Sequence, residues 1–349
     1  MKAITIVPGK ANSATLEEVP EPVESDGNVL VRALALGICG TDFELVSGQY
    51  GWAPPGRQRL ILGHESLGRV EQAPADSGFA KNDLVVGIVR RPDPVPCVGC
   101  AVGQWDMCRN DQYTERGIKE RDGYGSERWR IESNFLVKLD PRLEARGILM
   151  EPASVLAKAW DQIERIGHRA EWKPKTVLIT GAGPIGLLGA LMGKQRGLEV
   201  HVLDRVTEGL KPELVHQLGG EYHTGRVQDL KLRPDIIIEC TGVDTVIVDS
   251  MSQLGSFGIL CLAGVSSHGQ TDKLDVGNLN RRLVLENCVI FGTVNANRGH
   301  YELAAKALSQ ADPDWLSRLI SRREKLDNWH AVLQRQADDI KVIVEFSQN

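Results

Sequence analysis

The chain has 349 residues, of which 42% are hydrophobic and 25% charged, so it has the composition of a globular protein and the length for two domains. Its net charge of −5 gives no sign of the basic surface that nucleic-acid-binding proteins carry, and no apolar stretch has the length of a membrane-spanning helix. Neither nucleic acid nor a membrane is therefore expected as a partner.

The N-terminal part of the chain predicts an irregular antiparallel barrel, because short β-rich runs are separated by clusters of Gly and Pro rather than by helices. The runs are Ala3–Val7, Val29–Ala35, Leu67–Glu71, Leu84–Val89 and Phe135–Leu139. Met1 leads straight into the first run, so no signal peptide is expected. The seven cysteines are an odd number and do not read as a disulfide framework, which favours the reducing cytoplasm.

Potential metal ligands lie at three places in this part of the chain. Cys39 precedes Gly-Thr-Asp, His64 and Glu65 lie in the run Gly-His-Glu-Ser-Leu-Gly, and Glu151 precedes a proline. Thiolate, imidazole and carboxylate together suit zinc, and three protein ligands with one open position are typical of a catalytic site. Each residue taken singly has an ordinary alternative: a buried cysteine, a core or surface histidine, a solvated glutamate.

Three further cysteines have the spacing of metal ligands. They follow the pattern Cys-x2-Cys-x7-Cys, at Cys97, Cys100 and Cys108. The favoured interpretation is a structural zinc in a small lobe, and the alternative is a lobe that keeps its thiols without metal. Loss of such a zinc is expected to loosen the lobe more than it alters the chemistry.

From Gly147 to Ile166 the pattern becomes helical, and strands and helices then alternate. The strands are expected at Thr176–Thr180, Val200–Leu203, Ile236–Glu239, Ile259–Ala263 and Val289–Thr293. This alternation predicts a parallel, doubly wound sheet, so the fold class is α/β. The last strand, Ile340–Phe346, cannot stand alone, and we expect it to rejoin the sheet of the first domain. The predicted domains are 1–155 with 292–349, and 156–291.

A glycine-rich turn after the first of these strands carries the most specific signal in the chain. The run is Gly181, Ala182, Gly183, Pro184, Ile185 and Gly186. A helix follows it, and a second strand ends in an acid about 30 residues after the first strand began, which is the spacing of a dinucleotide-binding fingerprint. Gly181 permits the tight turn, Gly183 the approach of a pyrophosphate, and Gly186 the close packing of helix and strand. The helix N-terminus offers free N–H groups to that pyrophosphate.

The acid at the end of the second strand is Asp204. A carboxylate at this position binds the ribose 2′-hydroxyl and repels a 2′-phosphate, which favours NAD. Arg205 follows it and Lys211 is near, so NADP is expected to be tolerated.

Together these motifs resemble the zinc-dependent medium-chain alcohol and polyol dehydrogenases. The motifs at 37–42, 63–68 and 181–186 occur in the family's order, the resemblance covers nearly the whole chain, and its branch looks like the glucose 1-dehydrogenases. The resemblance implies a GroES-like catalytic domain, a Rossmann domain, and a homodimer or homotetramer. The run Ile259–Val265 is a candidate for a sheet that continues across a two-fold axis.

The resemblance also implies roles for single residues. Cys39 and His64 correspond to ligands of the catalytic zinc, with Glu65 and Glu151 completing the ligand shell or exchanging within it. Thr41 matches the hydroxyl that relays a proton between substrate and solvent. Asp42 matches the carboxylate that orients the zinc-bound histidine, a role with a clear physical basis.

In the lobe the chain departs from the family pattern. Members often carry a fourth cysteine three residues before the first of these, and that position is Pro94 here, which cannot ligate. Asp93 beside it is the candidate for a fourth, oxygen ligand.

The implied substrate is a sugar. Glu115 lies seven residues after the last lobe cysteine, where glucose dehydrogenases of this family bind sugar hydroxyls, and Asn295 matches an asparagine that reaches both nicotinamide and sugar. Thr241, Gly264 and Val265 follow later strands, where the family lines the nicotinamide side. The alternatives are a surface acid for Glu115 and ordinary loop residues for the others.

We therefore expect oxidation of an aldose, D-glucose before others, at C1 to the lactone. Zinc would polarise the C1 hydroxyl and NAD or NADP would accept the hydride. One alternative is a different polyol, amino alcohol or specialised sugar as the substrate of the same scaffold. Another, of a different class, is a nucleotide-binding sensor that has lost catalysis, but a sensor has no need of the intact set Cys39, Thr41, His64 and Glu65.

Overall fold

The computed structural model describes residues 1–266 and 274–347. Its contacts divide the chain into two compact units, a first unit of Met1–Ser154 with Asn295–Asn349 and a second unit of Val155–Val294. Within the described residues, no helix combines the length and the apolar character that a membrane crossing requires.

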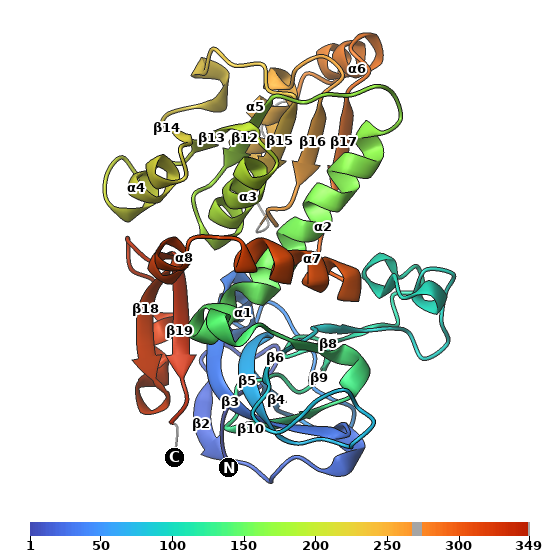
Figure 1. Cartoon of the computed structure of the whole chain (residues 1–349), viewed down its shortest axis with the longest axis vertical. Coiled ribbons are helices and arrows are strands. Elements are labelled where there is room, and N and C mark those ends of the chain that lie inside the picture. Colours follow the sequence, from blue (N-terminus) through green and yellow to red (C-terminus); the bar gives the residue numbers. More distant parts are fainter. Residues whose placement is uncertain (267–273, 348–349) are drawn as a thin grey trace. The chain divides into compact units, whose positions relative to one another are not determined.

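The first unit is built mainly of short strands (Figure 1). They are β1 (Lys2–Ile6), β2 (Thr15–Glu18), β3 (Val29–Ile38), β4 (Leu60–Ile61), β5 (Glu65–Gln72), β6 (Leu84–Gly87), β7 (Arg90–Arg91), β8 (Thr114–Arg116), β9 (Glu120–Arg121), β10 (Arg128–Ile131), β11 (Leu136–Lys138), β18 (Ile320–Lys325) and β19 (Lys341–Glu345). Its largest sheet has the order β11-β6-β5-β3-β19-β18, with β10 also paired to β3, and two smaller sheets have the orders β2-β1-β4 and β7-β8-β9.

Helices of the first unit are short and lie between these strands. The α-helices are α1 (Gly40–Val46), α7 (Arg298–Ser309) and α8 (Pro313–Leu319). The 3-10 helices are η1 (Glu24–Asp26), η2 (Cys100–Val102), η3 (Trp105–Met107), η4 (Ser133–Phe135), η5 (Pro141–Leu149) and η7 (Leu326–Leu333).

The chain's last strand completes the large sheet, as predicted. β19 pairs antiparallel with β3 and parallel with β18. Val342 and Val344 therefore share one core with Val29, Val31 and other apolar side chains of the N-terminal strands. The first unit is closed by residues more than 300 positions apart, such as Ile38 and Val342 in register.

The second unit is the predicted doubly wound sheet. Its elements are α2 (Met150–Gly167), which begins in the first unit, β12 (Thr176–Thr180), α3 (Pro184–Gln195), β13 (Glu199–Leu203), α4 (Leu210–Gln217), β14 (Glu221–His223), η6 (Val227–Asp229), β15 (Ile236–Glu239), α5 (Asp244–Gln253), β16 (Ile259–Leu262), α6 (Val276–Leu285) and β17 (Val289–Gly292). All neighbouring strands pair in parallel, in the order β14-β13-β12-β15-β16-β17.

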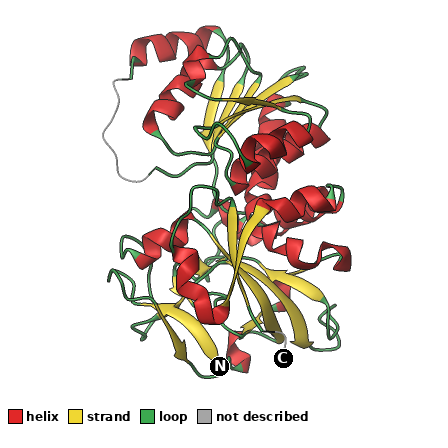
Figure 2. Ribbon diagram, turned by 90° about the vertical axis from the view of Figure 1, so that its left-hand side faces the viewer, coloured by secondary structure: helices red, strands yellow, loops and turns green. Residues whose placement is uncertain are grey.

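The central strands of this sheet are buried on both faces because helices cover both (Figure 2). The five predicted strands are confirmed to within one residue at each end. The edges of the sheet differ from expectation. One edge strand, β14, has three residues and was not predicted, and the other edge is β17, so the run that begins at Ile259 forms the last strand but one.

Candidate active site

The pairing of β3 with β5 brings the first predicted metal ligands together. Gly37 of β3 lies opposite Glu65 of β5, so Cys39 just after one strand faces His64 just before the other. The Sγ atom of Cys39 lies 3.0 Å from Nε2 of His64. One ligand atom each from Cys39, His64 and Glu65 lies within 4.8 Å of the other two. Residues 25 positions apart in the chain thus form one compact group.

Local structure holds the thiol and the imidazole in place. Cys39 is the N-cap of α1, where its sulfur accepts a hydrogen bond from the backbone N–H of Thr41 at 3.3 Å. Asp42 is fully buried, and its Oδ2 accepts the Cys39 backbone N–H at 2.9 Å. Its Oδ1 lies 3.8 Å from Nδ1 of His64, and both of these buried atoms lack a hydrogen-bond partner.

This orphaned pair is the arrangement that a metal at Nε2 requires. A histidine that ligates through one nitrogen carries its proton on the other and usually donates it to a carboxylate. Although burial opposes the charged form, Cys39 and Asp42 raise the pKa of His64 well above its ordinary value. Sulfur, nitrogen and oxygen donors at these separations fit zinc.

Glu65 is paired with a lysine that does not belong to any of the predicted motifs. Both of its carboxylate oxygens accept hydrogen bonds from Nζ of Lys341, at 2.6 and 2.7 Å, and both side chains are 1% exposed. Lys341 opens β19 and also donates to the carbonyl of Ile38. Gly37 is required beside this pair, because a Cβ there would lie 2.0 Å from the Glu65 carboxylate.

Glu151 opens α2 near this group. Its oxygens are not among the atoms that lie within 4.8 Å of one another. Burial raises the pKa of Glu151 to about 7. The nearby imidazole of His64 lowers this pKa, and the carboxylate of Glu65 raises it further. The site therefore gathers two glutamates, Asp42 and a thiol around one ammonium group, a surplus of acids that a divalent cation would balance.

The two predicted sugar-binding residues contact each other although they are 180 positions apart. Nδ2 of Asn295 donates to Oε1 of Glu115 at 2.7 Å. The same oxygen accepts from Nε and lies near Nη2 of Arg90, each at 3.0 Å, and Glu115 and Arg90 are both buried. Asn295 has a left-handed φ of 61°, which asparagine tolerates better than most residues. Arg90, which holds the Glu115 carboxylate, was not among the predicted residues.

The lobe that carries η2 and η3 stands out from the sheets of the first unit (Figure 1). Its three cysteines, Cys97, Cys100 and Cys108, converge with their sulfurs within 4.8 Å of one another. Backbone N–H groups of Cys100 and Arg109 lower the pKa of Cys97 to about 7, whereas burial raises that of Cys100 to about 11.

Asp93 lies beside this lobe but its carboxylate is engaged elsewhere. Oδ1 accepts the backbone N–H of Val95 and Oδ2 the side-chain amide of Asn110, each at 2.7 Å. Within residues 1–266 and 274–347, the potential ligand atoms that lie within 4.8 Å of one another in the lobe are the three cysteine sulfurs. The Asp93 carboxylate is not one of them. Use of Asp93 as a zinc ligand would require it to leave these partners.

The glycine-rich turn of the second unit has the predicted geometry. Gly181 has a φ of 91°, and a Cβ on Gly186 would lie 1.8 Å from the Gly181 carbonyl oxygen, so both positions require glycine. A Cβ on Gly183 would meet no atom within 4 Å. The backbone at Gly183, the N-cap of α3, is therefore open to the approach of another group, as the prediction of a pyrophosphate site requires.

Asp204 is tied to the same turn. Its Oδ2 accepts the backbone N–H of Ala182 at 2.6 Å and its Oδ1 that of Val206 at 3.1 Å. Lys211 Nζ lies 3.7 Å from Oδ2, and Arg205 points to solvent. An acid and one ammonium group thus lie together at the end of β13, and Arg205 beside them is exposed.

A buried acid that was not predicted organises the loops after β15. Glu239 accepts hydrogen bonds from the backbone N–H and the hydroxyl of Thr241, and from the backbone N–H of Gly242 at 3.2 Å. Gly264 packs against this turn, since a Cβ there would lie 2.3 Å from the Gly242 nitrogen. Val265 after it is 74% exposed.

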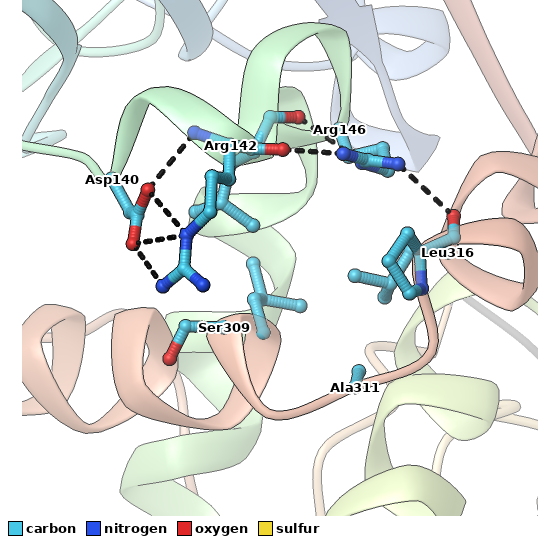
Figure 3. Close-up of a pocket in the computed structure, with 9 residues that line it drawn as sticks. Asp140, Arg142, Arg146, Ser309, Ala311 and Leu316 are labelled. Atoms are coloured by element: carbon cyan, nitrogen blue, oxygen red, sulfur yellow. Dashed lines mark hydrogen bonds and ion pairs between the residues drawn. The ribbon is translucent and has the colours of Figure 1, made fainter.

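A separate pocket of about 130 Å³ in the first unit does not belong to these groups (Figure 3). It lies between η5 and helices α7 and α8, and its charged side chains bond one another or the backbone. Arg142 Nε donates to Asp140 at 3.0 Å, and Arg146 Nη1 donates to the Pro313 carbonyl at 3.4 Å. No predicted site residue lines it.

Comparison with known proteins agrees with both units. Residues 25–141 match the family model of the alcohol dehydrogenase GroES-like domain, and residues 144–346 match that of the glucose dehydrogenase C-terminus. A glucose 1-dehydrogenase of Methanocella arvoryzae is 40% identical over 99% of each chain, and one of Caldivirga maquilingensis is 38% identical over 99% of each.

Solved structures show the same likeness. Haloferax mediterranei glucose dehydrogenase, in complex with NADP, Zn and gluconolactone, matches with a TM-score of 0.92 and 30% identity over 100% of both chains. Escherichia coli galactitol-1-phosphate dehydrogenase matches at a TM-score of 0.80 but 21% identity, which shows a shared fold alone. With both family models and full-length relatives in agreement, the chain belongs to the zinc-dependent medium-chain dehydrogenases, in their glucose dehydrogenase branch.

Proposed function

We propose that this protein oxidises D-glucose, or a closely related aldose, at C1 to the lactone with zinc and NAD or NADP. The observation that carries this proposal is the presence, in one unit, of the zinc-type group Cys39–His64–Glu65 and the sugar-type pair Glu115–Asn295. The full-length relatives named above are glucose 1-dehydrogenases, and the Haloferax enzyme binds gluconolactone, which supports the same reaction.

Each residue of the group has a defined task in this proposal. Cys39 and His64 hold zinc, with Glu65 or Glu151 as a further ligand, and Asp42 accepts the proton of Nδ1 to orient the imidazole. Bound zinc supplies a Lewis acid and the bound nicotinamide a hydride acceptor. Thr41 relays the proton of the C1 hydroxyl toward solvent. This first unit is then the catalytic domain, and the second unit the cofactor domain.

The proposal is tested by a substrate panel on zinc-replete protein, followed by nicotinamide absorbance. D-glucose, D-galactose, D-xylose, sorbitol, threonine and simple alcohols are each offered with NAD and with NADP. Reduction with aldoses supports the proposal. Turnover of a polyol or amino alcohol alone would keep the zinc chemistry but remove the sugar roles of Glu115 and Asn295, and silence on all of them would favour the sensor alternative.

The sugar pair makes a first prediction. Asn295→Ala removes a hydrogen-bonding side chain of the pair while Glu115 keeps its Arg90 partner, so kcat/KM for the aldose should fall by about ten- to a hundredfold, the equivalent of one hydrogen bond to a charged group. Asn287→Ala is a matched control, because Asn287 also has a left-handed φ, of 53°, and lies in the other unit. If kcat/KM falls equally in both variants, the loss is explained by strain of the backbone at a left-handed φ and not by a contact with the sugar.

We propose NAD as the preferred cofactor, with NADP accepted. The Asp204 carboxylate supports NAD, whereas Lys211, the exposed Arg205 and the NADP bound to the Haloferax relative support tolerance. Asp204→Asn keeps a hydrogen-bond acceptor for the turn and removes the charge. The ratio of kcat/KM with NADP to that with NAD should rise by about tenfold or more. Glu208→Gln, an exposed acid nearby, should leave the ratio unchanged, and no rise in Asp204→Asn would contradict the role of its charge.

For the lobe we propose a structural zinc held by Cys97, Cys100 and Cys108, with Asp93 as the fourth ligand once its carboxylate leaves Val95 and Asn110. Cys100→Ser should remove about one equivalent of zinc and make the lobe more sensitive to proteolysis, while the activity of the intact fraction changes little. Cys288→Ser, in the second unit, is the matched control. If zinc content and proteolysis are the same in both variants, the lobe keeps its thiols without metal.

We propose a homodimer or homotetramer in the cytoplasm. The outer edge of β17 pairs with no described strand, and exposed apolar side chains lie on or near the neighbouring α6, namely Val276, Val284 and Leu285. An unpaired strand edge beside such residues favours a sheet that continues into a second copy. All seven cysteines are free, which supports a reducing compartment.

A further inference from the structure

A third group of metal-ligand side chains lies in the second unit, apart from both predicted zinc sites. It consists of His201 on β13 with Glu221 and His223 on β14. In the parallel register His201 lies opposite Glu221, and Leu203 lies opposite His223. Because side chains two positions apart share one face of a strand, all three point to the same side of the sheet.

The three potential ligand atoms form a compact triangle. Nδ1 of His201 lies 2.9 Å from Nε2 of His223 and 3.0 Å from Oε2 of Glu221, and the last two atoms are 3.9 Å apart. A tetrahedral ion with ligands at about 2.0–2.1 Å places them about 3.3–3.4 Å from each other, so small side-chain movements would meet that geometry.

Protons alone satisfy this triangle poorly. If Nδ1 of His201 carries a proton, it can direct that proton at only one of two acceptors. If it does not, it can accept the proton of Nε2 of His223, but it then lies 3.0 Å from a Glu221 carboxylate oxygen with no proton between them. The other nitrogen of His201, Nε2, is buried without a hydrogen-bond partner, although Glu199 lies 3.5 Å away. A cation at the centre would satisfy all three atoms together.

The surroundings favour a bound ion that keeps an open side to water. His201 is 2% exposed and lies opposite Leu178 of β12, on the face that carries an apolar core cluster. Glu221, by contrast, has a side chain that is 66% exposed. Two imidazoles and a carboxylate with room for water are donors that suit zinc and its neighbours in the first transition series.

We propose that His201, Glu221 and His223 bind a divalent cation of the zinc class, which fixes the edge strand β14 to β13. The site is independent of the catalytic proposal, since it shares no residue with either predicted zinc site. It lies next to the cofactor end of the sheet, because the backbone N–H of Asp204 donates to the His223 carbonyl at 3.1 Å. Binding there should therefore stabilise the strand that supports Asp204.

The test is a cobalt titration of the full-length protein, supplied beforehand with two equivalents of zinc that fill the two thiolate-containing sites and leave the His201 group open. Cobalt binding is followed by visible and near-ultraviolet absorbance. A His-His-Glu site gives cobalt d–d bands without the thiolate charge-transfer band that either cysteine site would add, so cobalt in this site is distinguishable from cobalt in the other two. We expect one such equivalent in the wild type and a Kd at least about tenfold higher in His223→Gln and in Glu221→Gln. His168→Gln, an exposed histidine of the same unit, should bind cobalt like the wild type.

Thermal unfolding gives a second, independent measurement. Added Zn²⁺ should raise the Tm of the wild type and of His168→Gln, but not that of the two ligand variants. Glu221→Gln changes an exposed side chain, so folding of this variant is expected to be intact and can be checked by circular dichroism. The proposal is overturned if wild type and ligand variants take up cobalt equally, or if the wild type shows no thiolate-free cobalt signal.

Discussion

Substitution of His64 by alanine should reduce kcat/KM for the aldose by about a thousandfold or more, because a Lewis acid contributes several kcal/mol and each 1.36 kcal/mol is a factor of ten. The potential ligand atoms of Cys39, His64 and Glu65 lie close together where β3 ends and β5 begins. Nδ1 of His64 faces the buried carboxylate of Asp42. Loss of the imidazole removes one ligand of the proposed zinc and leaves Asp42 without its partner. Zinc content should fall by about one equivalent together with activity.

The measurement combines steady-state kinetics with metal analysis of the same samples. His330→Ala, an exposed histidine of the same unit, is the matched control and should retain both zinc and turnover. Cys39→Ala should behave like His64→Ala. Wild-type turnover by Cys39→Ala protein that is verified to lack metal would remove the zinc assignment.

Lys341→Met should destabilise the zinc-free protein by about 3–5 kcal/mol, the usual cost of removing one partner from a buried ion pair. Both oxygens of Glu65 lose their donor, and the carboxylate is left buried beside Glu151 and Asp42. Zinc is removed beforehand because a bound cation would take over part of the neutralisation. Calorimetry should show a Tm lower by roughly 10 °C.

Two further variants isolate the cause of this loss. Lys138→Met removes a lysine from a surface pair with Asp83 and should cost about 1 kcal/mol or less. The double variant Lys341→Met, Glu65→Gln removes the stranded charge and should recover much of the stability. A Tm for Lys341→Met equal to that of Lys138→Met would show that the buried pair contributes little.

The fold followed from the sequence wherever apolar patterning was long enough to be specific. The apolar run Thr176–Thr180 and the glycine-rich turn after it together specify a strand, a turn and a helix. Both ends of strand β12 were therefore predicted at the correct residues. β14 was missed because its three residues, all of them titratable, carry no hydrophobic alternation. Its pairing with β13 depends on the neighbouring strand, which single-sequence patterning does not contain.

The sequence predicted the acidic, thiol and imidazole side chains of the candidate site, but it did not predict the basic side chains that pair with them. Cys39, His64 and Glu65 lie in short motifs whose residue types suit zinc. Arg90 and Lys341 show no such pattern, since a single base near a strand normally reaches solvent. Their roles arise from partners 25 and 276 positions away, at Glu115 and Glu65, and only the folded chain brings these together.

The place of β19 between β3 and β18 has a consequence for synthesis on the ribosome. Strands β1 to β11 emerge early, and the second unit follows as one continuous segment that can form its own parallel sheet. The first unit cannot close until the last strand appears, and the acids of the metal group lack their ammonium partner until Lys341 has left the exit tunnel. A chain that stops after the second unit would therefore expose an open sheet edge along β3 and would be a substrate for chaperones and proteases.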